Sequence, residues 1–90
     1  MNTPTTTAAA LAGVRVIEMG QLIAGPFCGK TLGEFGADVI KIEPPGAGDP
    51  LRNWRLIQDG TSVWWQVQSR NKRSIALDLR NPQGQAIARR

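Results

Sequence analysis

Two short apolar segments rich in β-branched residues flank a helical pattern, and this arrangement constrains the fold more than any other feature. Residues 14–19 (VRVIEM) and 38–43 (DVIKIE) have the length and composition of buried strands. Between them, Gly25 and Pro26 predict the start of a helix, with proline at the first helical position, and Gly36 predicts its end. Strand, helix and strand in this order predict a right-handed parallel crossover.

The remainder of the sequence predicts a third strand and a further helix. Residues 44–50 (PPGAGDP) are too rich in proline and glycine to be anything but a loop, and residues 62–68 (SVWWQVQ) fit either a short helix or a strand. A third strand is predicted over residues 74–78 (SIALD). Asn81 as N-cap and Pro82 as the first helical residue then begin a helix that reaches the last residue.

These elements define an α/β fold, a Rossmann-like parallel sheet with flanking helices that is incomplete in 90 residues. A parallel sheet is covered on both faces, and about two helices are too few to cover three strands, so we expect the fold to continue further along the chain. Residues 1–10 are a Thr/Ala-rich leader that we expect to be flexible, and residues 11–90 form the folded part. The leader resembles neither a signal peptide nor a membrane span, which predicts a soluble protein without a membrane partner.

The absence of histidine, together with a single cysteine, Cys28, narrows the possible chemistry. Disulfide frameworks, Cys/His zinc sites and histidine-activated nucleophiles are excluded, so the sequence predicts no metal site. We expect Cys28 to be a small buried residue on the core face of the first helix, together with Phe27, Leu32 and Phe35. The three tryptophans are expected to anchor the core or a subunit interface.

The charge is distributed unevenly along the chain, and this predicts an anionic ligand. Residues 1–51 carry three basic and five acidic side chains, whereas residues 52–90 carry eight basic and two acidic ones. The basic half contains a cluster at residues 70–73 (RNKR), in which Lys72 and Arg73 are candidates to bind phosphate groups. A solvated basic surface explains the same charges equally well. No recognised nucleic-acid-binding motif accompanies the cluster, so a nucleic acid is not the expected partner.

Two nucleotide-binding motifs are approximated but not satisfied. Residues 24–31 (AGPFCGKT) nearly match a phosphate loop, but a helix that begins at Pro26 places Lys30 about one turn inside it. A dinucleotide fold would need a glycine-rich turn that residues 20–25 (GQLIAG) lack. A nucleotide-like ligand at the carboxyl ends of the strands remains compatible with an open parallel sheet.

Residues 11–90 resemble, in unbroken order, the beginning of the family III CoA-transferases, which include formyl-CoA transferase and the related α-methylacyl-CoA racemase. The segments that carry the resemblance are 11–18 (LAGVRVIE), 24–26 (AGP), 32–43 (LGEFGADVIKIE), 45–49 (PGAGD) with Arg52, and 71–78 (NKRSIALD). The resemblance implies a cytoplasmic enzyme of acyl-CoA metabolism whose amino-terminal domain binds coenzyme A. It also implies an interlocked homodimer at full length, in which two chains thread through each other.

The resemblance further implies which residues contact coenzyme A. The family positions fall on residues of the first strand-to-helix turn and of the segment after the third strand: Ile23, Ala24, Leu77, Asp78, Leu79 and Arg80. Pro44 replaces a basic residue that often follows the second strand in the family, so this chain departs from the family at that position.

In the family, an aspartate carboxylate attacks the acyl-CoA, and an enzyme-bound CoA thioester is then resolved by an acceptor carboxylic acid. No carboxylate of this chain lies in that aspartate's motif, so no catalytic residue is assigned, and we expect the 90 residues alone to be inactive. The resemblance also fits an acyl-CoA racemase of the same superfamily. A stand-alone module that binds coenzyme A or a nucleotide is the alternative outside enzymes.

Overall fold

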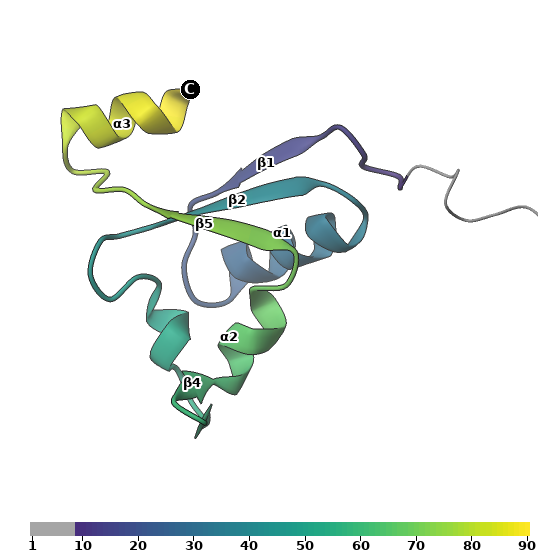
Figure 1. Ribbon diagram of the computed structural model, residues 1–90, viewed down its shortest axis with the longest axis vertical. Coiled ribbons are helices and arrows are strands. Elements are labelled where there is room, and N and C mark those ends of the chain that lie inside the picture. The colour runs from purple at the N-terminus through teal and green to yellow at the C-terminus, as the bar shows by residue number, and fades with distance from the viewer. Residues whose placement is uncertain (1–8) are drawn as a thin grey trace, which may run out of the picture.

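The computed structural model describes residues 9–90, which form a three-stranded parallel sheet with helices around it (Figure 1). The strands are β1 (Arg15–Glu18), β2 (Asp38–Glu43) and β5 (Lys72–Ala76), in the order β1-β2-β5. Both pairings are parallel. The predicted α/β class with a parallel crossover is therefore confirmed, although the third strand begins two residues earlier than predicted.

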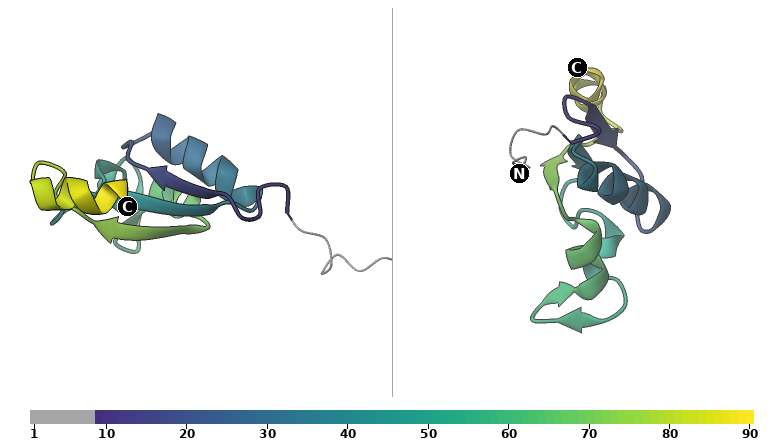
Figure 2. Two further views of the ribbon diagram at one scale, coloured as in Figure 1. Left: turned by 90° about the horizontal axis from the view of Figure 1, so that it is seen from above. Right: turned by 90° about the vertical axis from the view of Figure 1, so that its right-hand side faces the viewer.

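Helix α1 (Ala24–Glu34) connects β1 to β2 and covers one face of the sheet (Figure 2). It begins two residues before Pro26, which is thus its third residue rather than its first. Proline is tolerated there because the amide groups of the first turn have no acceptor within the helix. The helix ends as predicted at Gly36, where φ is +103°. The Gly36 and Ala37 amides donate to the carbonyls of Gly33 and Leu32, which is the Schellman arrangement.

The buried face of α1 consists of Pro26, Gly29 and Gly33 rather than of its large apolar residues. A Cβ atom at Gly33 would already lie 3.3 Å from the Asn71 Cβ and 3.5 Å from a methyl group of Val39. No large side chain fits at so short a distance between helix and sheet.

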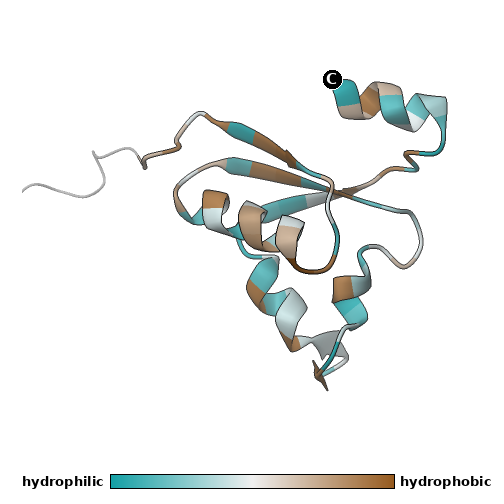
Figure 3. Cartoon of the chain, turned by 180° about the vertical axis from the view of Figure 1, so that it is seen from behind, coloured by the Kyte–Doolittle hydropathy of each residue, from teal (hydrophilic) through white to brown (hydrophobic). Residues whose placement is uncertain are grey.

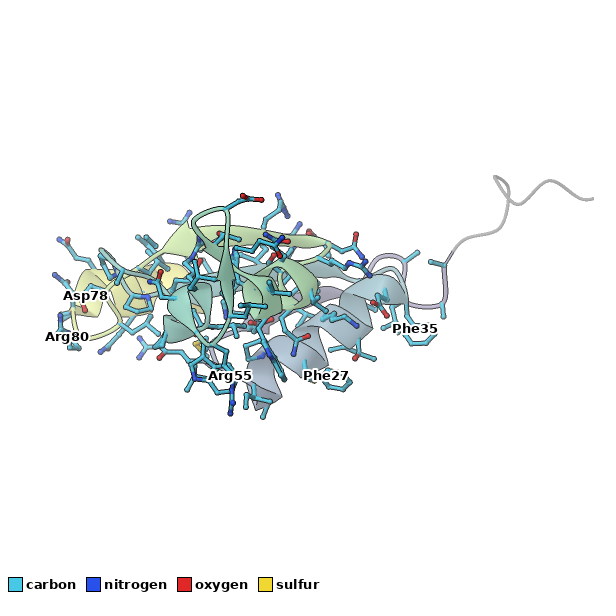
Figure 4. All side chains as sticks on the ribbon, turned by 90° about the horizontal axis from the view of Figure 1, so that it is seen from below. Phe27, Phe35, Arg55, Asp78 and Arg80 are labelled. Atoms are coloured by element: carbon cyan, nitrogen blue, oxygen red, sulfur yellow. The ribbon has the colours of Figure 1, made fainter. Side chains whose placement is uncertain are left out.

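The predicted core face of α1 is consequently wrong. Phe27 and Phe35 are 56% and 57% exposed and point away from the sheet (Figure 4), Leu32 is only partly buried, and Cys28 is exposed. The apolar residues do share one side of the helix, but that side is turned away from the closest contact with the sheet: Cys28 and Leu32 line a shallow pocket beside β1, and the two phenylalanines point to solvent.

A small second unit connects β2 to β5 and lies beside one edge of the sheet (Figure 1). Its elements are η2 (Pro50–Asn53), β3 (Ile57–Gln58), β4 (Thr61–Ser62) and α2 (Val63–Gln68). Residues 62–68, for which the sequence left two possibilities, form a helix capped by Ser62, whose Oγ accepts from the Trp65 amide at 3.2 Å. The Trp54 and Trp64 rings meet edge to face at 5.3 Å. None of the three tryptophans is fully buried in the described structure.

Helix α3 (Pro82–Arg89) follows β5 and lies on the other side of the sheet edge from α2 (Figure 1). Its Ile87 lines an open pocket of about 380 Å³ together with Ile17 and Ile75 of the strands. Its predicted N-cap is confirmed, since Asn81 Oδ1 accepts from the Gln83 amide at 2.8 Å. On the sheet, Ile17 and Ile75 are 43% and 39% exposed, and Figure 3 shows apolar residues along the strands. Within residues 9–90 only one face of the sheet is covered, and no helix there is long and apolar enough to cross a bilayer.

Candidate functional site

A pocket of about 510 Å³ lies at the carboxyl ends of the three parallel strands. The end of β1 and the loop after it contribute Met19 and Gln21, and the loop after β2 contributes Pro44 and Pro45. The segment after β5 contributes the third side, residues 77–80. This is the edge at which open parallel sheets bind ligands, because the connecting loops diverge there.

Asp78 and Arg80 are, with Gln21 and Glu43, the polar residues that line this pocket, and they lie together at one end of the molecule (Figure 4). Asp78 Oδ1 accepts from the backbone amide of Arg80 at 3.0 Å and from its Nε at 3.1 Å. These hydrogen bonds from Arg80 hold the pKa of Asp78 below its usual value. The Arg80 side chain is 92% exposed, so its terminal guanidinium nitrogens remain open to a ligand.

Ile23 and Ala24 lie at the amino end of α1, outside that pocket. Ile23 is the N-cap residue and is 46% exposed, and Ala24 is the first helical residue. Ile23 lines a different, apolar pocket of about 440 Å³ together with Phe27 and Trp64. Within the described residues, the predicted CoA contacts of the β1–α1 loop and those after β5 therefore lie at different pockets. Gln21, which belongs to the β1–α1 loop, lines the carboxyl-end pocket.

Of the three basic residues predicted to contact the ligand, Lys72, Arg73 and Arg80, the structure places only Arg80 at the carboxyl-end pocket. Lys72 is buried, and its ammonium contacts Glu18 Oε1 at 2.6 Å and the Pro26 carbonyl at 2.8 Å. Burial lowers the pKa of Lys72, and its pairing with Glu18 opposes that shift. Arg73 binds Asp38, the first residue of β2, at 2.7 Å and thus lies toward the amino ends of the strands.

A buried network of charged side chains beneath the loops was not predicted from the sequence. The Lys41 ammonium lies 2.6 Å from Glu18 Oε2 and 2.7 Å from Asp49 Oδ2, and all three side chains are at most 3% exposed. Lys72 joins the network through Glu18. The strand pattern indicated burial but gave no sign that the buried residues would be charged, because pairing partners come from separate elements.

Glu43, the last residue of β2, is the centre of a second buried cluster. Its carboxylate accepts from the guanidinium of Arg52, from the Asp49 amide at 2.8 Å and from the Ser74 hydroxyl. These bonds, those from Arg52 foremost, lower the pKa of Glu43 to about 2, against the effect of burial. Both clusters thus consist of carboxylates with fixed basic or hydrogen-bonding partners.

The remaining motifs do not form sites. Lys30 is the seventh residue of α1 and pairs with Glu34 at 2.9 Å, so it does not lie at the start of the helix as a phosphate loop requires. Its side chain is only 16% exposed. Among residues 9–90, no group of three histidine, cysteine or acidic side chains is placed to hold a metal ion.

The chain is similar to known CoA-transferases. Succinyl-CoA–D-citramalate CoA-transferase of Chloroflexus aurantiacus is 57% identical over 81 residues, which are 89% of this chain and 20% of that protein. Human succinyl-CoA:glutarate CoA-transferase is 44% identical over 78 residues, or 86% of this chain and 18% of that protein. The chain therefore spans about a fifth of the length of these relatives.

Solved structures show the same relationship. A CAIB/BAIF family protein from Brucella suis superimposes with a TM-score of 0.80 at 36% identity, over 92% of this chain and 23% of that one. The sequence model described as CoA-transferase family III matches residues 11–90. On this sequence and structural agreement, the chain belongs to CoA-transferase family III and corresponds to the amino-terminal segment of its members.

Proposed function

We propose that this segment binds coenzyme A at the carboxyl ends of β1, β2 and β5, within an enzyme that moves CoA between an acyl-CoA and a carboxylic acid. The observation that carries the proposal is the pocket of about 510 Å³ with Arg80 exposed at its rim. Relatives that cover most of this chain are named as CoA-transferases, which supports the same ligand.

Arg80 is the residue we assign to a phosphate group of CoA. Its Nε is held by Asp78, which fixes the plane of the guanidinium and leaves the two terminal nitrogens to bind phosphate oxygens. Asp78 stays ionised, and its negative charge is partly offset by the Arg80 guanidinium, so it repels the phosphate less. Leu77, Leu79 and Pro44 provide apolar walls for the rest of the cofactor. Ile23 and Ala24 are proposed to contact CoA from the β1–α1 loop.

The transfer itself is proposed to use an aspartate outside these 90 residues. Its carboxylate would attack the acyl carbonyl and release CoA thiolate, and the thiolate would then attack the aspartyl carbonyl of the resulting anhydride and release the first acid. The enzyme-bound CoA thioester would pass CoA to the acceptor acid by the reverse steps. Buried Glu18, Glu43 and Asp49 are held in ion pairs or hydrogen bonds and are poorly placed for this role.

The relatives suggest the class of acid. Several of them are named for succinyl-CoA or succinate together with malate, citramalate or glutarate, all of which are dicarboxylic acids. We therefore propose a dicarboxylic acceptor and a succinyl-type donor, acting in a cytoplasmic homodimer. The uncovered face of the sheet is consistent with further protein packing there.

An isomerase or racemase acting on CoA thioesters is the second candidate. A 2-methylfumaryl-CoA isomerase from Chloroflexus aurantiacus is 42% identical over 78 residues, so a segment of this kind also serves reactions other than transfer to a free acid. Both candidates share the proposed CoA site. They would be separated by whether a labelled free acid is incorporated into the CoA thioester product.

Calorimetric titration of the purified chain with CoA tests the site. Arg80→Ala should weaken CoA binding by about 5- to 150-fold, the range expected for one charge-assisted phosphate contact. Arg89→Ala removes an exposed positive charge from α3, outside this pocket, and is the matched control. Equal affinities of the wild-type chain and Arg80→Ala would exclude Arg80 from the site. Transfer of CoA by the 90 residues alone would contradict the proposed external aspartate.

A further inference from the structure

The loop between β1 and α1, residues 19–23, has a fixed shape that its own sequence does not favour. Leu22 has φ of +66°, a left-handed conformation that costs a leucine roughly 1–2 kcal/mol. The loop also closes tightly on itself, since a Cβ at Gly20 would lie 3.0 Å from the Gly25 Cα. Such a conformation persists only where surrounding groups hold it.

The group that holds Leu22 is the buried carboxylate of Asp49, which comes from the loop after β2. Asp49 Oδ1 accepts from the Leu22 amide at 3.0 Å and from the Leu51 amide at 2.9 Å. Its other oxygen, Oδ2, lies 2.7 Å from the Lys41 ammonium. The Asp49 side chain is fully buried, so water does not compete for these bonds.

Lys41 connects this anchor to a second point on the same loop. Its ammonium donates to the Gly20 carbonyl at 3.2 Å while it pairs with Asp49 and Glu18. Lys41 belongs to β2, the central strand of the sheet, so the loop is attached to a strand that is hydrogen-bonded on both sides. One ion pair thus fixes the backbone of the β1–α1 loop at two positions.

We propose that Asp49 is a positioning residue, which acts through the Leu22 amide to keep the β1–α1 loop in the conformation that presents Ile23 and Ala24 to the ligand. The consequence for CoA rests on the function proposed above, whereas the effect on the loop does not. When the anchor is lost, the competent loop conformation becomes a minor state, and the apparent affinity falls in proportion to its population.

Amide hydrogen exchange by NMR tests the effect on the loop without any ligand. Asp49→Ala should increase exchange at Leu22 by about tenfold or more, because a hydrogen bond to a charged acceptor is lost. The amides of Val39 and Ile42 in β2 should change much less. Asp59→Asn, at an exposed acidic residue, is the control and should leave Leu22 unchanged. An unchanged exchange rate at Leu22 in Asp49→Ala, or an equal increase at Leu22 and in β2, would overturn the proposal.

Rescue by glycine separates positioning from general destabilisation. CoA affinity should fall about tenfold in Asp49→Ala and should be partly restored by adding Leu22→Gly, since glycine adopts positive φ without strain. Lost affinity that Leu22→Gly does not restore would overturn the positioning role. A wild-type chain that does not bind CoA would instead contradict the proposed function, with the exchange result unaffected.

A milder variant covers the case in which Asp49→Ala does not fold. Asp49→Asn keeps an oxygen that can accept from Leu22 but removes the charge, so the hydrogen bond should be about half as strong. Leu22 should then exchange about threefold faster than in the wild type while the β2 amides stay protected. An equal increase in exchange rate at Leu22 and at the β2 amides of Asp49→Asn would also overturn the proposal.

Discussion

Glu43 accepts hydrogen bonds from two nitrogens of Arg52, each 2.7 Å long, although the Glu43 side chain is only 4% exposed and that of Arg52 is 39% exposed. Burial alone would raise the pKa of a carboxyl group, but these bonds lower the pKa of Glu43 to about 2. The pair joins the end of β2 to η2 and holds the loop that contains Asp49 against the sheet. Its loss should therefore be visible in stability and should depend on pH.

The Glu43–Arg52 pair should stabilise the fold fully above pH 4.5 and progressively less as the pH falls toward 2. The ordinary pKa of the carboxyl group, 4.5, applies to the unfolded chain and the lowered value, about 2, to the folded one. The shift corresponds to on the order of 2 kcal/mol, with allowance for the exposed side of Arg52. Arg52→Gln should be less stable than the wild type at pH 6, and the difference should shrink at pH 3.

Urea unfolding at several pH values measures this difference. Arg55→Gln is the matched control, because Arg55 is exposed and stacks on Trp54, with its guanidinium carbon 4.6 Å from the ring centroid. A constant difference between Arg52→Gln and the wild type from pH 6 to pH 3 would show that Glu43 is not the titrating partner.

Gly29→Ala should destabilise the fold although alanine is the better helix former. A Cβ at Gly29 would collide with the Glu18 carboxylate and would lie 3.3 Å from the Lys72 Cε. Displacing Glu18 separates it from two buried ammonium groups, and we expect a net loss of about 2 kcal/mol or more after the helix-propensity gain of about 1 kcal/mol. Gly33→Ala is the comparison, since its nearest contacts, at 3.3 Å and 3.5 Å, require only small shifts. Equal unfolding free energies for the two variants would contradict this account of the network.

The parts of the fold that the sequence predicted correctly depend on local signals. Gly36 and Asn81 mark helix ends through backbone conformation and capping, and both act within a few residues of themselves. The strand at residues 38–43 was predicted with its observed bounds because its β-branched run is continuous. The carboxyl-end pocket followed from the parallel order of the strands, since that order places the loops at one edge.

The features that could not be predicted depend on distances between elements. The face of α1 with Gly29 and Gly33 is buried because the helix approaches the sheet closely, and a pattern of large apolar residues carries no information about that distance. Lys41 and Asp49 appeared as ordinary polar residues of a strand and a loop, and they are buried because they pair with each other and because Lys41 also pairs with Glu18. The separation of Ile23 from Arg80 likewise depends on where the loops diverge.

Lys30→Ala should change the unfolding free energy by only about 0.5 kcal/mol, the usual contribution of an ion pair one helical turn apart. The structure supports this value because Lys30 pairs with the partly exposed Glu34 and contacts no buried acid. The variant should also bind CoA like the wild type. Fluorescence titration with ATP provides the complementary test, since ATP binding by the wild type that is lost in Lys30→Ala would restore the phosphate-loop interpretation.

Phe27→Ser should reduce self-association of the chain without weakening its fold. Phe27 is 56% exposed and adjoins Ile23 and Trp64 in the apolar pocket of about 440 Å³, which solvent reaches in the described structure. Apolar surface of this kind promotes association, and it contributes little to monomer stability because its exposed atoms gain nothing on folding.

Leu51→Ala is the opposite case, since Leu51 is fully buried and its truncation should cost about 2–5 kcal/mol. Sedimentation velocity over a range of concentrations and urea unfolding of both variants give the two quantities. Unchanged association in Phe27→Ser would show that the chain associates through another surface, such as the sheet face with Ile17 and Ile75. A large loss of stability in that variant would show that Phe27 packs more closely than its exposure indicates.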